Sequence, residues 1–146
     1  MLERNTADLT LLAQVAVPYG ISLRPWEERD FERIQLLSEA EGWLTATARP
    51  EDALLAWQRS WPALVAEVEG LVVGFVRAIS DGAVTTYIAE LLVAPEWRAI
   101  GVGLALVDAC QAVAQGTRLD LLSMPRAVEF YRRAGFQQYI GFRRPA

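Results

Sequence analysis

Three apolar stretches in the middle of the chain, separated by two short turns, restrict the fold more than any other feature. They span residues 63–67, 71–79 and 83–93, and their apolar content is typical of β-strands. A Glu-Gly pair lies in the first gap and Ser-Asp-Gly in the second, which are residues that tight turns favour. Turns this short join antiparallel neighbours. The sequence therefore predicts a three-stranded antiparallel meander.

A strand and two helices are expected before this meander. Residues 21–25 alternate like a strand, and Asp30 stands where it can cap a first helix. Pro50 is a favoured first-turn residue and opens a second helix. We expect residues 1–20 to form an irregular or partly helical extension and residues 21–146 to form a single domain.

Helices and strands alternate after the meander. The pattern predicts a helix over 101–115, a strand over 118–122, a helix over 125–134 and a final strand over 136–142. The resulting order is β-α-α-β-β-β-α-β-α-β. It is typical of an α/β protein in which helices cover both faces of a mixed sheet.

Several kinds of chemistry are excluded by residues that the chain lacks. The sequence contains no His and no Lys, which removes His-based triads and metal sites, Schiff bases and the Walker A loop. We therefore expect no metal. A net charge of -4 makes nucleic acid a poor partner, and no stretch is apolar enough to cross a membrane. The one cysteine rules out an internal disulfide, and with no secretory signal pattern at the start of the chain the expected location is the cytoplasm.

The stretch over 90–106 carries the strongest chemical signal. A strand ends there, a short loop follows, and Gly101 and Gly103 open a helix. The first N–H groups of a helix have no partner within it, so together with Arg98 they form an anion site that suits a pyrophosphate. Alternatively, the glycines merely allow tight packing between strand and helix. A Rossmann site is disfavoured because Leu106 stands at the third glycine position.

Two motifs resemble the GNAT acetyltransferase family. Residues 98–103 are similar to its signature Gln/Arg-x-x-Gly-x-Gly/Ala, and residues 91–95 look like the strand that leads to it. Residues 127–136 resemble the last helix of the family, A-x-x-F-Y-x-x-x-G-F. The resemblance extends over about residues 21–142. It implies a GNAT-like fold in which the strands at 83–93 and 118–122 splay apart.

The resemblance also implies acetyl-CoA as cofactor and a site for it. Backbone groups of Leu92 and Val93 would bind the pantetheine arm. The pyrophosphate would be held by Arg98 and by the amides of Ala99, Ile100, Gly101, Val102 and Gly103.

The sequence departs from the family pattern at two positions. Met124 stands where Asn is frequent, seven residues before Tyr131, so one polar cofactor contact is expected to be missing or replaced. Ala99 stands where Gly is common, which is acceptable if its φ is negative.

Two residues are candidates for proton transfer. Tyr131 occupies the position of the family's frequent general acid, and the pKa values of phenol and thiol are comparable. Packing in the core is the alternative role for this tyrosine. Glu90 is the candidate general base, and its alternative is a solvated or salt-bridged strand residue. Alternation places Glu90 on the same strand face as Leu92.

The expected function is transfer of an acetyl group from acetyl-CoA to a primary amine of a small molecule. The acceptor amine would meet Trp43 and Tyr87, although core packing is the alternative for the tryptophan. Two other functions stay open, a non-catalytic acyl-CoA sensor and a protein N-acetyltransferase. The resemblance also allows a homodimer.

Overall fold

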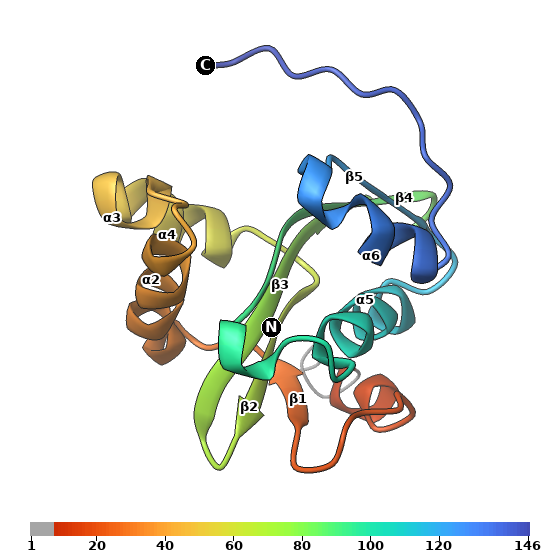
Figure 1. Cartoon of the computed structure of the whole chain (residues 1–146), viewed down its shortest axis with the longest axis horizontal. Coiled ribbons are helices and arrows are strands. Elements are labelled where there is room, and N and C mark those ends of the chain that lie inside the picture. The colour runs from red at the N-terminus through yellow and green to blue at the C-terminus, as the bar shows by residue number, and fades with distance from the viewer. Residues whose placement is uncertain (1–7) are drawn as a thin grey trace.

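A single mixed sheet of five strands lies at the centre of the molecule (Figure 1). The computed structural model describes residues 8–146. In sheet order, which is also chain order, the strands are β1 Ser22–Pro25, β2 Ala63–Val68, β3 Leu71–Ser80, β4 Thr85–Val93 and β5 Arg118–Leu121. The first four pair antiparallel, and β5 pairs parallel with β4. The predicted meander and the mixed sheet are confirmed.

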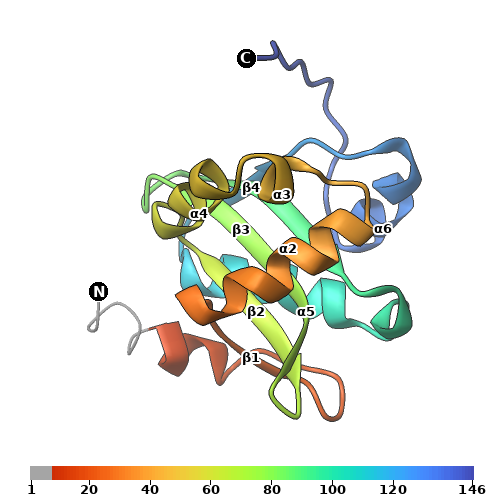
Figure 2. The same ribbon diagram turned by 90° about the vertical axis from the view of Figure 1, so that its left-hand side faces the viewer.

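Helices cover both faces of the sheet (Figure 2). Helices α2 Phe31–Ala40, α3 Thr45–Ala48 and α4 Pro50–Gln58 lie on one face, and α5 Val102–Val113 lies on the other. Helix α6 Val128–Arg133 follows β5, and short 3-10 turns form η1 Glu28–Asp30, η2 Pro95–Trp97 and η3 Pro125–Ala127. The one-turn helix α3 was not predicted. Among the helices of residues 8–146, none has the length and apolar character needed to cross a membrane.

Two hydrophobic cores hold these layers together. The core between the sheet and α5 includes Leu64, Val76, Ile88, Leu106 and Cys110, and Leu12 from the N-terminal extension joins it. The core on the other face includes Ile34, Trp57, Val65, Phe75 and Leu92. Because both faces of the central strands are covered, their sequences are nearly continuous apolar runs.

Asp30 does not cap α2 with its side chain, contrary to the prediction. Its carboxylate instead accepts two hydrogen bonds of 2.8 Å from Arg24 and one of 2.7 Å from the Glu27 N–H. Burial alone would raise the pKa of Asp30, but these hydrogen bonds outweigh burial and the pKa is lowered. The 3-10 turn η1 directs Asp30 toward Arg24 on β1. The carboxylate pairs with that arginine and is therefore not available to cap α2.

The strand predicted over residues 136–142 is absent. After α6 the chain runs as an irregular segment that leaves the body of the protein (Figure 1). Tyr139, Ile140 and Phe142 are 78%, 87% and 92% exposed. Alternating sequence permits a strand, but a strand also needs a neighbour to pair with and an apolar face to cover. Among residues 8–146, none pairs with this segment as a strand.

Candidate active site

A gap opens in the sheet where β4 and β5 part. The two strands pair from Thr85 with Arg118 to Ile88 with Leu121, and there the pairing ends. Strand β4 continues to Val93 alongside β3, with Ala89 as an extra residue that shifts the register. The predicted splay is therefore confirmed, and one side of the last residues of β4 has no strand beside it within residues 8–146.

The backbone groups that face this gap follow from the alternation of an antiparallel ladder. The Ala94 N–H donates to the Val73 carbonyl at 2.7 Å, so every second residue of β4 points its backbone groups to β3. Leu92 is in this set, whereas Leu91 and Val93 point theirs into the gap. The Val93 carbonyl accepts a hydrogen bond of 2.8 Å from Arg98 Nε. Of the two strand residues predicted to bind the pantetheine arm, only Val93 has its backbone groups directed there.

Helix α5 begins beside the gap, and no group of residues 8–146 accepts a hydrogen bond from its first amides. Its N-cap is Gly101, whose φ of 99° suits glycine, and no side chain caps the helix. The first turn has no acidic residue, and Arg98 lies just before it. Ala99 has a φ of 63°, so the condition under which alanine would be acceptable at this position is not met. The loop turns back toward the helix here, and an L-residue in this region carries conformational strain.

Gly103 serves packing as well. A Cβ at this position would lie 3.1 Å from two ring atoms of Phe130 and 3.7 Å from the Val93 side chain. Its small size therefore lets α6 approach the start of α5. The packing interpretation of the glycine pair is confirmed at Gly103, and the anion site stays a prediction.

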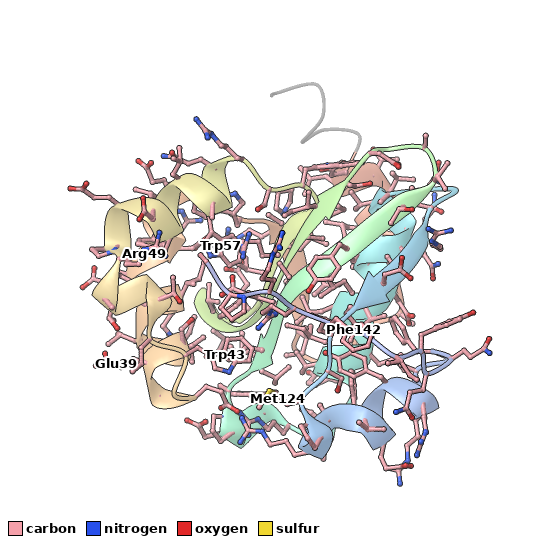
Figure 3. All side chains as sticks on the ribbon, turned by 90° about the horizontal axis from the view of Figure 1, so that it is seen from above. Glu39, Trp43, Arg49, Trp57, Met124 and Phe142 are labelled. Atoms are coloured by element: carbon pink, nitrogen blue, oxygen red, sulfur yellow. The ribbon has the colours of Figure 1, made fainter. Side chains whose placement is uncertain are left out.

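A cleft of about 810 Å³ joins these features. Its walls come from α2 and α3, from β3 and β4, from the loop before α5, from η3 and α6, and from Arg143 in the C-terminal segment. Figure 3 looks down on the cleft, with Trp43 on the α2 side and Met124 on the side of α6. A smaller hollow of about 220 Å³, which shares Ala99, Gly103 and Phe130 with the cleft, continues past the start of α5. A long ligand with a diphosphate fits this arrangement, because the free amides and Arg98 stand where the gap meets the hollow.

Tyr131 lines the cleft and is partly buried. Its ring packs edge-on against Phe130 and Phe136, with centroids 5.0 and 5.4 Å apart. Burial raises the pKa of Tyr131, so its hydroxyl is protonated at neutral pH and can donate a proton. Tyr131 therefore packs against neighbouring aromatic rings and also lines the cleft.

Glu90 also lines the cleft, but it is ion-paired. Its carboxylate accepts a hydrogen bond of 2.7 Å from Arg77 Nε, and Arg77 also donates to Ser60 Oγ at 3.1 Å. The contacts of Glu90 are thus those of a salt-bridged strand residue, which was the alternative to the role of general base. Arg77 already occupies the carboxylate, so Glu90 can take up a substrate proton only if it shares or leaves this ion pair.

The two aromatic candidates for acceptor contacts differ in position. Trp43 lines the cleft, and Tyr87 is not among the residues that line it. Tyr87 lies where β4 is still paired on both sides, with Ile79 on β3 and Asp120 on β5. Cys110 is fully buried and burial raises its pKa to about 12, so it is no nucleophile.

Arg126 and Ser38 line the cleft and were missed from the sequence. Glu41 and Arg126 form an ion pair there, and Ser38 Oγ is buried without a hydrogen-bond partner in the described chain. The cleft contains four arginines and two glutamates, so its lining is positive although the whole chain carries -4. The net negative charge of the chain, which on its own would favour a cationic ligand, therefore does not represent the charge of the cleft. No sequence pattern marks these residues, because they come from segments far apart in the chain.

Comparison with known proteins decides the family. The model of the acetyltransferase (GNAT) domain matches residues 59–138, more than half of the chain. The chain belongs to the GNAT acetyltransferase family. The predicted family and enzyme class are confirmed, and this GNAT protein is an acetyl-CoA-dependent acyltransferase. No curated protein sequence matches it at a significant level.

Solved structures share the fold of this GNAT protein over most of their length. A crystal structure from Deinococcus radiodurans R1, assigned as an acetyltransferase, has 26% identity and a TM-score of 0.71, with 89% of this chain and 91% of that chain covered. A GNAT-family structure from Xanthomonas campestris pv. campestris has 26% identity and a TM-score of 0.69, with 90% and 96% covered. The acetyltransferase AAC(6')-Iy, in complex with a bisubstrate analogue of CoA, has 19% identity and a TM-score of 0.63, with 86% and 99% covered, and shows the shared fold alone.

Proposed function

We propose that this protein transfers the acetyl group of acetyl-CoA to a primary amine of a small molecule by direct attack in a ternary complex. The observation that carries the proposal is the gap between β4 and β5, which opens beside the uncapped start of α5 and has Tyr131 on its far side. Acetyl-CoA, when bound, supplies the acetyl group activated as a thioester.

The diphosphate is held by the start of α5. The amides of Ala99, Ile100, Gly101, Val102 and Gly103 are the proposed donors, with Arg98 as the cation. The positive end of the helix dipole strengthens these hydrogen bonds. Met124 lies on the cleft wall and gives no amide contact, so the backbone and the arginines provide the polar interactions.

Val93 has the proposed role of positioning and polarising the acyl group. Its N–H points into the gap and can donate to the acyl carbonyl oxygen, which makes the carbonyl carbon more electrophilic. Removing one such donor typically costs about 3 kcal/mol of transition-state stabilisation. Leu91 presents a second backbone N–H to the same gap, and it takes the place that the sequence assigned to Leu92.

Tyr131 supplies the proton that the leaving thiolate needs. Its raised pKa keeps the hydroxyl protonated, and the rings of Phe130 and Phe136 pack against its own ring and position it. Glu90 has the proposed role of accepting a proton from the amine, directly or through water. Because its carboxylate is already paired with Arg77, we expect the reaction rate to depend less on Glu90 than on Tyr131.

The acceptor is proposed to lie between Trp43 and Glu90. A cleft with α2 and α3 on one side and η3 and α6 on the other encloses a small molecule better than it accommodates an extended peptide. This shape favours a small-molecule amine over a protein substrate. Turnover, and not the shape of the cleft, distinguishes an enzyme from a sensor.

The test combines binding and turnover. Calorimetry with CoA measures the first, and acetyl transfer to a panel of small amines, followed by thiol release, measures the second. We expect Tyr131→Phe to bind CoA normally and to lose activity by about 10²-fold or more. Tyr19→Phe is the matched control, because Tyr19 is fully exposed and is not among the residues that line the cleft.

The outcomes separate the candidate functions. CoA binding without transfer to any amine would favour the sensor. Transfer to peptide N-termini but not to small amines would favour a protein substrate. If Tyr131→Phe keeps full activity, the tyrosine has no role as the acid.

A further inference from the structure

Glu41 bridges two arginines across the cleft. It directly follows α2, and its Oε2 pairs with Arg98 Nη2 while its Oε1 pairs with Arg126 Nη2 at 2.9 Å. The three residues come from three separate segments, and all of them line the cleft. The Glu41 side chain is only 16% exposed, whereas that of Arg126 is 67% exposed. One largely buried carboxylate thus holds two cations that reach toward the start of α5.

The charges in this cluster do not balance. Two guanidinium groups face a single carboxylate, and no other acidic side chain of the described chain pairs with either arginine. Each guanidinium carries five N–H donors, of which only a few are used here. Arg98 donates one hydrogen bond to Glu41 and one to the Val93 carbonyl, and Arg126 donates one to Glu41. The cluster therefore has both positive charge and donors to offer to an incoming anion.

Arg98 also covers a backbone group that the proposed ligand needs. Its Nε donates to the Val93 carbonyl, which faces the gap between β4 and β5. A pantetheine amide that binds at Val93 competes for that carbonyl. A diphosphate at the start of α5 competes with Glu41 for the other end of the same guanidinium.

We propose that Glu41 is a stand-in anion, which holds Arg98 and Arg126 in the cleft until the diphosphate of the cofactor takes both arginines. The inference rests on the proposed function and adds Arg126 to the diphosphate site. Two consequences follow from charge. Glu41 lowers the affinity for the cofactor, because its carboxylate both neutralises the arginines and repels the phosphates. Its removal leaves the two cations free and strengthens binding.

The first experiment measures the affinity for CoA by calorimetry for the wild type, Glu41→Gln and Glu39→Gln. Glutamine keeps the size of the side chain and removes its charge. We expect Glu41→Gln to bind CoA about fivefold more tightly, which is the upper effect of a partly exposed ion pair. Glu39→Gln is the matched control, because Glu39 lies on α2 two residues before Glu41, is exposed and is not among the residues that line the cleft (Figure 3). Because the effect is electrostatic, it should be larger in about 0.1 M salt than in about 1 M salt.

A second experiment asks whether the effect passes through the arginines. Arg126→Gln should weaken CoA binding about fivefold, while Arg132→Gln, which removes an exposed arginine paired with Glu129, should not. In an Arg98→Gln, Arg126→Gln background, Glu41→Gln should tighten binding less than in the wild type, because only the direct repulsion of the phosphates remains to be removed. A general structural effect of Glu41 would persist undiminished in that background.

The possible results are separable. If the wild type binds CoA and Glu41→Gln binds no more tightly than Glu39→Gln, the stand-in role is refuted and the proposed function is untouched. Weaker binding by Glu41→Gln refutes it too and makes Glu41 a supporting residue for the arginines. If neither the wild type nor Glu41→Gln binds CoA, the proposed function and this inference both fail. Circular dichroism and thermal unfolding confirm that each variant is folded.

Discussion

Gly101 allows a direct test of whether the backbone shape of the loop before α5 matters for cofactor binding. Its φ of 99° is one that L-residues rarely adopt, and a Cβ there would meet only Pro18 Cγ at 3.5 Å, an ordinary contact. Gly101→Ala therefore introduces strain without a clash. Gly116, at φ 80° with nothing within 4 Å of a Cβ, offers the same perturbation far from the cleft.

The expected magnitudes follow from this geometry. A left-handed L-residue costs roughly 1–2 kcal/mol. Alanine also makes the unfolded chain less flexible than glycine does, which offsets about 0.5–1 kcal/mol of this loss of stability. Each variant should therefore lose about 1 kcal/mol of stability. Only Gly101→Ala shifts the amides that point to the diphosphate, and losing one hydrogen bond to a charged group costs about 1.5 kcal/mol, or roughly tenfold in affinity.

The assay pairs urea denaturation with calorimetry for both glycine variants. Similar losses of stability, with weaker CoA binding in Gly101→Ala alone, would support the amide site. Equal CoA affinity in the two variants would refute the argument that the loop's backbone grips the diphosphate. A much larger loss of stability in Gly101→Ala would show a packing role that the Cβ distances do not reveal.

Three further changes test other features of the structure. Asp30→Asn should cost about 3 kcal/mol in urea denaturation, because it breaks a buried pair with Arg24, whereas the exposed Asp52→Asn should cost less than about 0.5 kcal/mol. The lowered pKa of Asp30 means that this contribution is present above the ordinary carboxyl pKa of about 4 and is lost as pH falls through the folded value, so the difference between wild type and Asp30→Asn should shrink in acid. Ser38→Ala should raise the free energy of unfolding by about 1 kcal/mol, because it removes a buried hydroxyl without a partner; a loss would mean that the hydroxyl is bonded. Ala99→Gly should raise it by about 0.5 kcal/mol through relief of strain and leave CoA affinity unchanged, and a stability drop would contradict the positive φ.

Local patterns in the sequence identified most of the elements of the fold. The apolar stretches over residues 63–93 gave the meander because short turns leave antiparallel pairing as the simple solution. The two glycines after Arg98 marked the start of α5, since few residue types tolerate that loop. The strand expected over residues 136–142 failed because pairing depends on a neighbour and not on alternation alone. Helix α3 was missed because four residues give no periodic signal.

The sequence by itself determined the family and the meander and predicted the position of an anion site, because each depends on neighbouring residues and on motifs of fixed spacing. Only the tertiary structure decided that Val93 and not Leu92 faces the gap, since that depends on hydrogen-bond alternation with β3. It also decided that Glu41 joins Arg98 and Arg126, which lie 57 and 85 residues away along the chain. The positive charge of the cleft comes from residues that lie far apart in the sequence and meet only in the fold. A chain with a net charge of -4 can therefore present a positive site.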